Sequence, residues 1–423
     1  MDARAISTLL PLLSLCPSLA LAQEEAPGME SEVAPEPSPG FWDRFELRRS
    51  ISMEGRFESL DPELALVPER AVAPQEGRFS SAWLSADLGL RCVQDPCGGS
   101  SLVLNPRALA SMERDEARDL ELWLQQGYLR AILGDRLTIT LGKHVLGWGP
   151  GILYSPTNRA FSETLMTTTH REVLGKWATA LAISAGDSWS LSAAAVRMDS
   201  LSIASDSASY LAVSRVEYQN IGEDSLTVGV VGGVGNRYEA HAGGYAELGL
   251  GSAWTLGVEA AVSRGQVRDR GAALGGQASY EGDVGVEALA NARFGLAGGG
   301  EIGVELVYNS MSLNETERAA AAQLVPLTVQ ALHQGQGFHP LLEGAYAVLH
   351  ARLGELPPAK TMTFTASAIA AYPTGGALGH AELLCLWRNW RASASYAQAF
   401  GPSDSTLRIP VAKIGRLAVG YTF

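Results

Sequence analysis

The carboxyl end of the chain carries the feature that most restricts its fold. From Arg416 onward, small or polar residues alternate with large apolar ones, and the apolar members are Leu417, Val419, Tyr421 and Phe423. A period of two places the two sets on opposite faces of a β-strand. If the apolar face lies in hydrocarbon, every backbone N–H and C=O group needs a partner within the protein, and among sheets only a closed barrel supplies one for each strand. The carboxyl end therefore predicts an all-β chain.

The same alternation recurs in long segments along the whole chain. Strands of soluble proteins average about five or six residues, whereas these segments run to about ten or more, the length of a tilted strand that crosses a bilayer. Hydrophobic residues make up 46% of the chain without a run long enough for a membrane-spanning helix after the amino-terminal segment. We therefore predict a transmembrane antiparallel up-and-down β-barrel of about 18 strands. The expected spans are 41–57, 78–92, 99–108, 118–133, 136–146, 173–185, 188–198, 208–219, 224–234, 237–250, 253–265, 282–296, 301–312, 340–354, 359–372, 376–388, 390–400 and 410–423.

The amino-terminal segments are predicted to lie outside the barrel. Residues 1–22 have the features of a secretory signal peptide: Arg4 precedes a short apolar run, and residues 20–22 (Ala-Leu-Ala) fit the small-x-small cleavage rule. Residues 23–40 are acidic and rich in Pro and Ala, so we expect a disordered periplasmic leader. The barrel is predicted to occupy 41–423, and its even strand number places both of its ends in the periplasm.

The connections and the tryptophans predict which way the barrel points. Short turns alternate with longer loops, such as 147–172 and 314–337. In bacterial barrels the short turns face the periplasm, the long loops face outward, and aromatic residues form girdles at both interfaces. Five tryptophans fall at the expected short-turn ends, namely Trp42, Trp189, Trp254, Trp387 and Trp390.

The most distinctive segment follows the fifth expected strand. It reads Gly-Lys-His-Val-Leu-Gly-Trp-Gly-Pro-Gly over residues 142–151 and Tyr-Ser-Pro-Thr-Asn over 154–158. This Trp-Gly-x-Gly and Pro-Thr-Asn pattern, with the aromatic carboxyl-terminal strand, resembles porin-like bacterial outer-membrane β-barrels, and capsule-assembly barrels carry a similar Trp-Gly-Pro-Gly. The resemblance implies the outer membrane of a Gram-negative bacterium, contact with its lipid and passage of small solutes. It also implies that the barrel-assembly machinery reads Phe423 and Tyr421 as an insertion signal, and it allows a homo-oligomer.

This segment is the candidate for a pore constriction. Glycines around Trp148 permit backbone turns that other residues cannot make, so the loop is able to fold back into the lumen. The candidate constriction residues are His144, Trp148, Arg159, His170, Arg171 and Lys176. Their cationic character would favour anionic solutes. The alternative is that Trp148 and Pro150 pin a surface loop against the rim, with the charges solvated.

Charged residues on the polar faces of the expected strands are the candidates for the lumen. They are Arg48, Glu121, Arg215, Glu217, Glu259, Glu305, Glu382 and Arg416. A water-filled channel needs such residues because Arg or Lys facing lipid at mid-depth costs about 2–4 kcal/mol. The same charges are equally able to pair with one another and hold the wall in shape, so we assign no selectivity from them.

The remaining composition restricts the function. A net charge of −13 argues against a nucleic-acid partner. Cys92 and Cys97 flank a turn-like segment and are predicted to form a disulfide in an oxidising periplasm. No spacing typical of a metal site, and no Gly-x-Ser-x-Gly, occurs, so we predict no cofactor, no metal and no enzyme activity. Two alternatives to a porin-like channel stay open: a barrel component of a lipid or polysaccharide export or assembly system, and, with less support, an outer-membrane hydrolase.

Overall fold

The structure is a computed structural model. It describes residues 45–60, 78–92, 99–112, 119–134, 136–151, 154–158, 175–198, 209–220, 222, 224–235, 240–264, 284–296, 298–310, 312, 344–356, 361–402 and 413–422. Within these ranges, no helix is long and apolar enough to cross a membrane.

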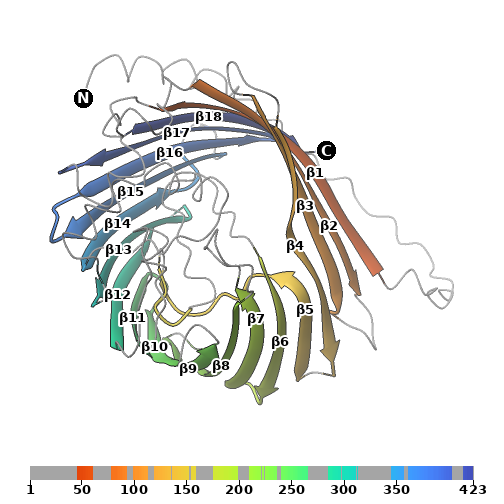
Figure 1. Ribbon diagram of the computed structural model, residues 1–423, viewed down its shortest axis with the longest axis vertical. Helices are drawn as coiled ribbons and strands as arrows, with labels where there is room; N and C mark the ends of the chain where they lie inside the picture. Colours follow the sequence, from red (N-terminus) through yellow and green to blue (C-terminus); the bar gives the residue numbers. More distant parts are fainter. Residues whose placement is uncertain are drawn as a thin grey trace, which may run out of the picture.

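Eighteen β-strands follow one another along the chain and form a ring (Figure 1). They are β1 (Phe45–Leu60), β2 (Arg78–Cys92), β3 (Ser101–Met112), β4 (Asp119–Leu133), β5 (Leu137–His144), β6 (Lys176–Ala185), β7 (Trp189–Met198), β8 (Ser209–Asn220), β9 (Ser225–Gly235), β10 (Ala240–Leu250), β11 (Trp254–Arg264), β12 (Val284–Leu296), β13 (Gly300–Asn309), β14 (Ala345–Leu353), β15 (Met362–Tyr372), β16 (Ala377–Trp387), β17 (Trp390–Phe400) and β18 (Lys413–Thr422).

Each strand pairs antiparallel with the next, and the last pairs with the first. The closing ladder runs from the Ser52–Thr422 pair to the Leu60–Ile414 pair, between β1 and β18. Closure leaves no unpaired edge, which is the condition for a sheet in hydrocarbon. The predicted closed antiparallel barrel of 18 strands is therefore confirmed. Strand β3 ends at Met112 instead of the predicted residue 108, and the predicted starts at 41 and 340 lie outside the described residues.

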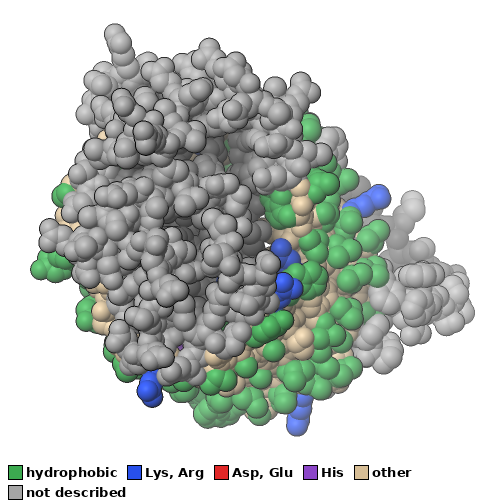
Figure 2. Space-filling model, in the orientation of Figure 1, with side chains coloured by type: hydrophobic (Ala, Val, Ile, Leu, Met, Phe, Trp, Pro, Cys, Tyr) green, Lys and Arg blue, Asp and Glu red, His purple; other side chains and the backbone are tan. Residues whose placement is uncertain are grey.

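Alternation along the strands separates an apolar outside from a polar inside. In β11, Leu256 and Val258 are exposed, whereas Glu259 and Ser263 on the other face are buried. The same holds around the ring, and Figure 2 shows mostly hydrophobic side chains over the described outward surface at its lower right. In a membrane, the exposed apolar face contacts lipid, so its exposure to solvent in the isolated chain is expected.

Aromatic pairs mark the end of the barrel that carries the short turns. A tryptophan near the start of a strand packs against an aromatic ring of the next strand in three places. The pairs are Trp189–Tyr218, Trp254–Phe294 and Trp390–Tyr421, with ring centroids 5.0, 4.8 and 4.9 Å apart. Trp387 lies at the same end, and Trp42 falls outside the described residues. We call this the girdle end.

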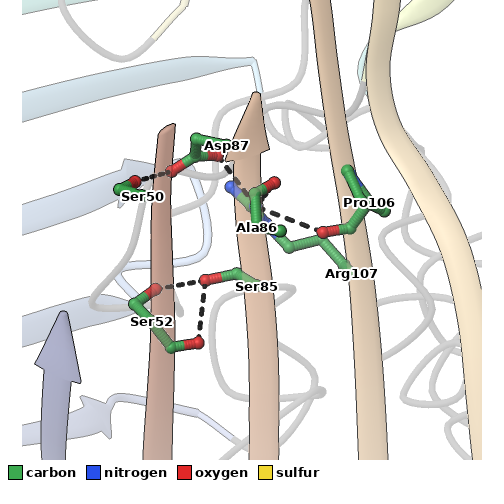
Figure 3. A network of polar contacts seen from close by, with 7 residues as sticks. All are labelled: Ser50, Ser52, Ser85, Ala86, Asp87, Pro106 and Arg107. Atoms are coloured by element: carbon green, nitrogen blue, oxygen red, sulfur yellow. Dashed lines mark hydrogen bonds and ion pairs between the residues drawn. The ribbon is translucent and has the colours of Figure 1, made fainter. Parts of the chain in front are cut away.

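The wall is irregular where Pro106 interrupts β3. Pro106 has no N–H to donate, and the register of β3 against β4 shifts at this residue. The Arg107 guanidinium donates to the Ala86 carbonyl at 3.2 Å and to the Asp87 carboxylate at 3.0 Å, and Asp87 also accepts from Ser50 at 3.2 Å (Figure 3). The β2–β3 pairing also skips Ala86 and Asp87, so the Arg107 side chain supplies a donor to β2 at this gap.

Candidate functional site: a segment folded into the barrel lumen

The chain leaves β5 and turns into the barrel instead of standing above its rim. Residues 145–151 and 154–158, which we call the lumen segment, lie against the inner faces of the strands that follow β5 around the ring, from β6 to β12. Figure 1 shows this yellow trace running from β5 across the interior towards β10 and β11. Leu146, Trp148 and Tyr154 of the lumen segment are buried in clusters with inward-facing strand residues.

Trp148 holds the first part of the lumen segment by apolar packing. It is buried in a cluster of inward side chains, together with Leu146. The strand members of this cluster are Ala178, Ala194, Val196, Leu211, Val213, Val231 and Tyr245. Burial of a large aromatic ring contributes several kcal/mol, roughly 3–5 by the cost of its truncation to Ala. The inner wall of β6–β10 is therefore apolar where the segment covers it.

The Glu259 carboxylate anchors the second part of the lumen segment. Its Oε1 accepts from the Ser155 hydroxyl at 2.6 Å, from the Thr157 backbone N–H at 2.6 Å and from the Thr157 hydroxyl. Glu259 is 3% exposed and Thr157 is fully buried. Three donors converge on one buried oxygen, which makes this the main polar attachment of the segment.

Two further hydrogen bonds tie the lumen segment to β12. The Tyr154 hydroxyl donates to the Glu287 carboxylate at 2.7 Å, and the Asn291 amide donates to the Pro150 carbonyl at 2.9 Å. Tyr154 also belongs to a second buried apolar cluster, which includes Leu289 on β12. The segment thus spans the lumen from β5 to β12, and the side chains it meets there are those the barrel turns inward.

An ion-pair network supports the Trp148 ring. The Arg215 guanidinium lies 5.4 Å from the ring centroid and 3.1 Å from the Glu217 carboxylate. Glu217 also accepts a hydrogen bond from the Tyr245 hydroxyl. A cation over an indole face is attracted by the ring quadrupole, so Arg215 contacts Trp148 while its charge is balanced by Glu217. Arg215 therefore contacts the lumen segment and forms an ion pair with Glu217.

Glycine is required at two positions of the lumen segment. Gly149 has φ +86, and a Cβ there would lie 2.3 Å from the Ser155 hydroxyl and 2.9 Å from both Glu259 carboxylate oxygens. A Cβ at Gly151 would lie 1.7 Å from the Tyr154 carbonyl oxygen. The Trp-Gly-Pro-Gly pattern therefore has a direct physical cause, since the turn and the carboxylate anchor leave no room for side chains.

The inner face of the strands that follow carries a row of mixed charge. The register sets five inward residues side by side from β14 to β18, namely Arg352, Thr365, Glu382, Ser395 and Arg416. His350 and His380 lie in the adjacent row, opposite Ser367. Both signs occur, so this part of the wall is polar without a single dominant charge.

The structure describes the side chains of six of the eight predicted lumen charges. Six lie on inward faces, opposite the exposed apolar side chains of their own strands: Arg215, Glu217, Glu259, Glu305, Glu382 and Arg416. Arg48 and Glu121 belong to β1 and β4, and their side chains lie outside the described residues. Four of the six are buried glutamates or arginines at less than a tenth exposure, so much of this charge holds the interior together.

The predicted constriction residues are brought together only in part. His144 ends β5, is buried, and its Nδ1 lies 3.1 Å from the Gly142 carbonyl, while Trp148 follows in the lumen. Lys176 opens β6 and pairs with His144. Arg159, His170 and Arg171 lie outside the described residues, as does Phe423, while Tyr421 packs in the girdle.

Sequence reasoning missed the groups that fasten the segment. Tyr154, Ser155 and Thr157 on the segment, and Glu287 and Asn291 on β12, were not singled out. A signal existed for the two β12 residues, because they share the inward period of their strand, opposite the exposed Val284 and Val286. No local pattern indicates that a loop more than a hundred residues earlier reaches them.

Two other predictions concern a disulfide and a metal site. Cys92 and Cys385 are both disulfide-bonded, and the pairing of Cys92 with Cys97, which lies outside the described residues, stays a prediction. Among the described residues, no group of three His, Cys, Asp or Glu side chains is arranged to hold a metal ion.

Comparisons with known proteins bear on the fold alone. No family model and no curated protein matches the chain. Solved structures do: Acinetobacter baumannii OccAB1 aligns with a TM-score of 0.56 and 12% identity over 89% of this chain and 96% of that one. Pseudomonas aeruginosa OccK5 (OpdH) gives 0.52 and 10% over 89% and 98%, and OccK11 (OpdR) gives 0.51 and 12% over 89% and 96%. The chain thus has the barrel fold of these proteins, at an identity too low to carry their activities over.

Proposed function

We propose that the protein is a porin-like channel of the outer membrane of a Gram-negative bacterium, through which small polar solutes diffuse. The observation that carries this proposal is the lumen segment, which enters a closed barrel and attaches to the inner wall at Glu259. A barrel of this strand number encloses a water-filled channel unless parts of the chain narrow it.

The path is bounded by two different surfaces. One is the lumen segment, which covers the apolar inner wall of β6–β10 and reaches β12. The other is the mixed-charge row between Arg352 on β14 and Arg416 on β18. Polar side chains on such a wall replace part of the hydration shell of a passing solute, whereas an apolar wall would not. The lumen segment follows His144, and the chain re-enters the sheet at Lys176. We expect the narrowest part of the channel at this segment.

Several expectations complete this proposal. Residues 1–22 direct export, 23–40 form the leader, and 41–423 form the barrel. Phe423 and Tyr421 are read by the assembly machinery, and the outward face contacts lipid. The cationic residues Arg159, His170 and Arg171 bias the constriction towards anionic solutes. A homo-oligomer is compatible with this function and is not required by it.

A single-channel recording tests the proposal. The purified chain, inserted alone into a planar bilayer, should conduct ions, and polar solutes should block this current. In a vesicle-swelling assay, the same solutes should pass through the channel. A barrel that belongs to an export system would conduct poorly without its partners, so a silent chain that is correctly inserted would contradict the proposal. Replacing Arg352 and Arg416 by Gln should move the reversal potential in a salt gradient towards cation preference, because two positive charges leave the wall.

A further inference from the structure

We propose that the barrel binds one phosphate-bearing lipid in a groove on its outer surface, where β18 closes onto β1. The groove has a volume of about 400 Å³ and lies at the girdle end. It is lined by Met53, Gly55, Trp390, Val419, Gly420 and Tyr421. This volume is within the range of small-molecule sites, roughly 300–1,000 Å³.

Glycine creates the hollow. Gly55 faces outward in the middle of β1, opposite Val419, and a Cβ placed on it would meet no atom within 4 Å. Met53 and Val419 stand on either side of it, each about half exposed. A missing side chain between larger ones leaves a furrow that runs with the strands, and its outward face excludes a water-soluble occupant once the barrel is in a membrane.

An aromatic rim closes the groove towards the girdle end. The Trp390 and Tyr421 rings pack edge to face, 4.9 Å apart, and Trp387 pairs with Trp390 across the turn between β16 and β17. Tryptophan and tyrosine prefer the depth of the lipid headgroups. The rim therefore lies where acyl chains end and headgroups begin.

A cationic side chain lies at the same end of the barrel, next to the aromatic rim. Arg388, in the turn between Trp387 and Trp390, is exposed, and its guanidinium lies 5.6 Å from the Trp387 ring centroid. The turn is tied to β18 by the Thr422 N–H, which donates to the Asn389 carbonyl at 2.9 Å. An apolar furrow with an aromatic rim, and a guanidinium on the neighbouring turn at the girdle end, match an acyl chain, its ester region and its phosphate in that order. This charge complementarity selects a phospholipid as the occupant.

Arginine is suited to this role. The guanidinium offers planar paired donors to phosphate and is held in place by stacking on an indole. Arg388 has φ 53, a backbone conformation that few residues other than Gly and Asn adopt readily. A test variant should therefore keep that conformation, which makes Arg388→Asn the appropriate change.

Native mass spectrometry of the full-length purified protein in detergent tests the site, with dioleoyl phosphatidylglycerol and dioleoyl phosphatidylcholine as probes. The unaltered protein should retain one phosphatidylglycerol molecule and prefer it to phosphatidylcholine. Arg388→Asn should weaken phosphatidylglycerol binding about fivefold and remove the preference, since one basic residue at a membrane surface contributes about that much. Gly55→Leu should abolish retention of either lipid, because the new side chain fills the furrow.

Matched controls separate this site from general lipid contact. Gly232→Leu adds the same side chain at an outward glycine of β9 that also has open space around it, and Arg136→Asn removes an exposed arginine from the turn between β4 and β5. Both should bind lipid like the unaltered protein, and all four variants should keep its ion conductance, which shows that they fold.

Two results would overturn the proposal. One is equal lipid retention in Gly55→Leu and Gly232→Leu. The other is a dimer, measured by light scattering, that Gly55→Leu dissociates, because the groove would then be a contact between two copies of this chain. Conductance does not depend on the lipid, so loss of this site leaves the channel proposal intact.

Discussion

Removal of the Glu259 carboxylate should free the lumen segment from the wall. In Glu259→Ala, the Ser155 hydroxyl and both Thr157 donors lose their acceptor at once. A buried donor that loses its acceptor costs about 1–3 kcal/mol, and bonds that share one acceptor do not add. Taking about 3 kcal/mol for the whole anchor, the population of the detached segment should rise roughly a hundredfold.

Single-channel recording measures this change directly. A segment that leaves the inner wall stops occupying its fixed position in the lumen, so the variant should show more frequent conductance steps above the main level. Thr157→Val removes one of the three donors and should have a smaller effect in the same direction. In the double variant, the cost of losing Thr157 should be largely absent, because its partner is already gone.

Tyr154→Phe is the matched control. It removes one hydrogen bond of the same segment, to the Glu287 carboxylate, and leaves the Glu259 anchor intact. Its conductance should stay near that of the unaltered protein. If Glu259→Ala showed the same conductance and the same noise as Tyr154→Phe, Glu259 would not hold the segment, and the assignment of the anchor would be wrong.

Three other changes test the wall and the segment. Trp148→Ala should cost roughly 3–5 kcal/mol of segment docking and increase conductance noise, since the ring fills a buried cluster. Gly149→Ala should lower the midpoint of thermal unfolding in detergent, because φ is +86 and the new Cβ has no room, whereas Gly147→Ala, with open space, should not. Val230→Arg, on the lipid face at the middle of β9, should cost about 2–4 kcal/mol in refolding titrations with lipid vesicles, and Val234→Arg near the strand end about 0–1.

Most of the barrel could be predicted from local sequence patterns. A period of two depends only on neighbouring residues, so the sequence shows directly which side chains share a face, and Glu259 and Glu305 could be placed inward before any tertiary contact was known. Strand ends were less exact, as in β3, which runs to Met112 instead of residue 108, because the last residues of a strand are set by pairing with its neighbours and not by their own pattern.

The position at which the lumen segment binds the wall is decided by the tertiary structure. Its glycines and Trp148 predicted an unusual turn, but Thr157 finds its acceptor on Glu259, 102 residues later. That hydrogen bond requires strands β5 to β11 to be paired and curved so that the segment reaches Glu259. The groove at Gly55 depends on closure of the barrel, because it forms between the first strand and the last.

The sequence alone thus determined that long amphipathic strands would close into a ring with an apolar outside, because alternation and backbone hydrogen bonding leave few other arrangements in hydrocarbon. Only the tertiary structure decided which inward carboxylates would be sealed beneath the lumen segment and which polar residues would remain as a wall, because that depends on where a loop without regular structure finds partners.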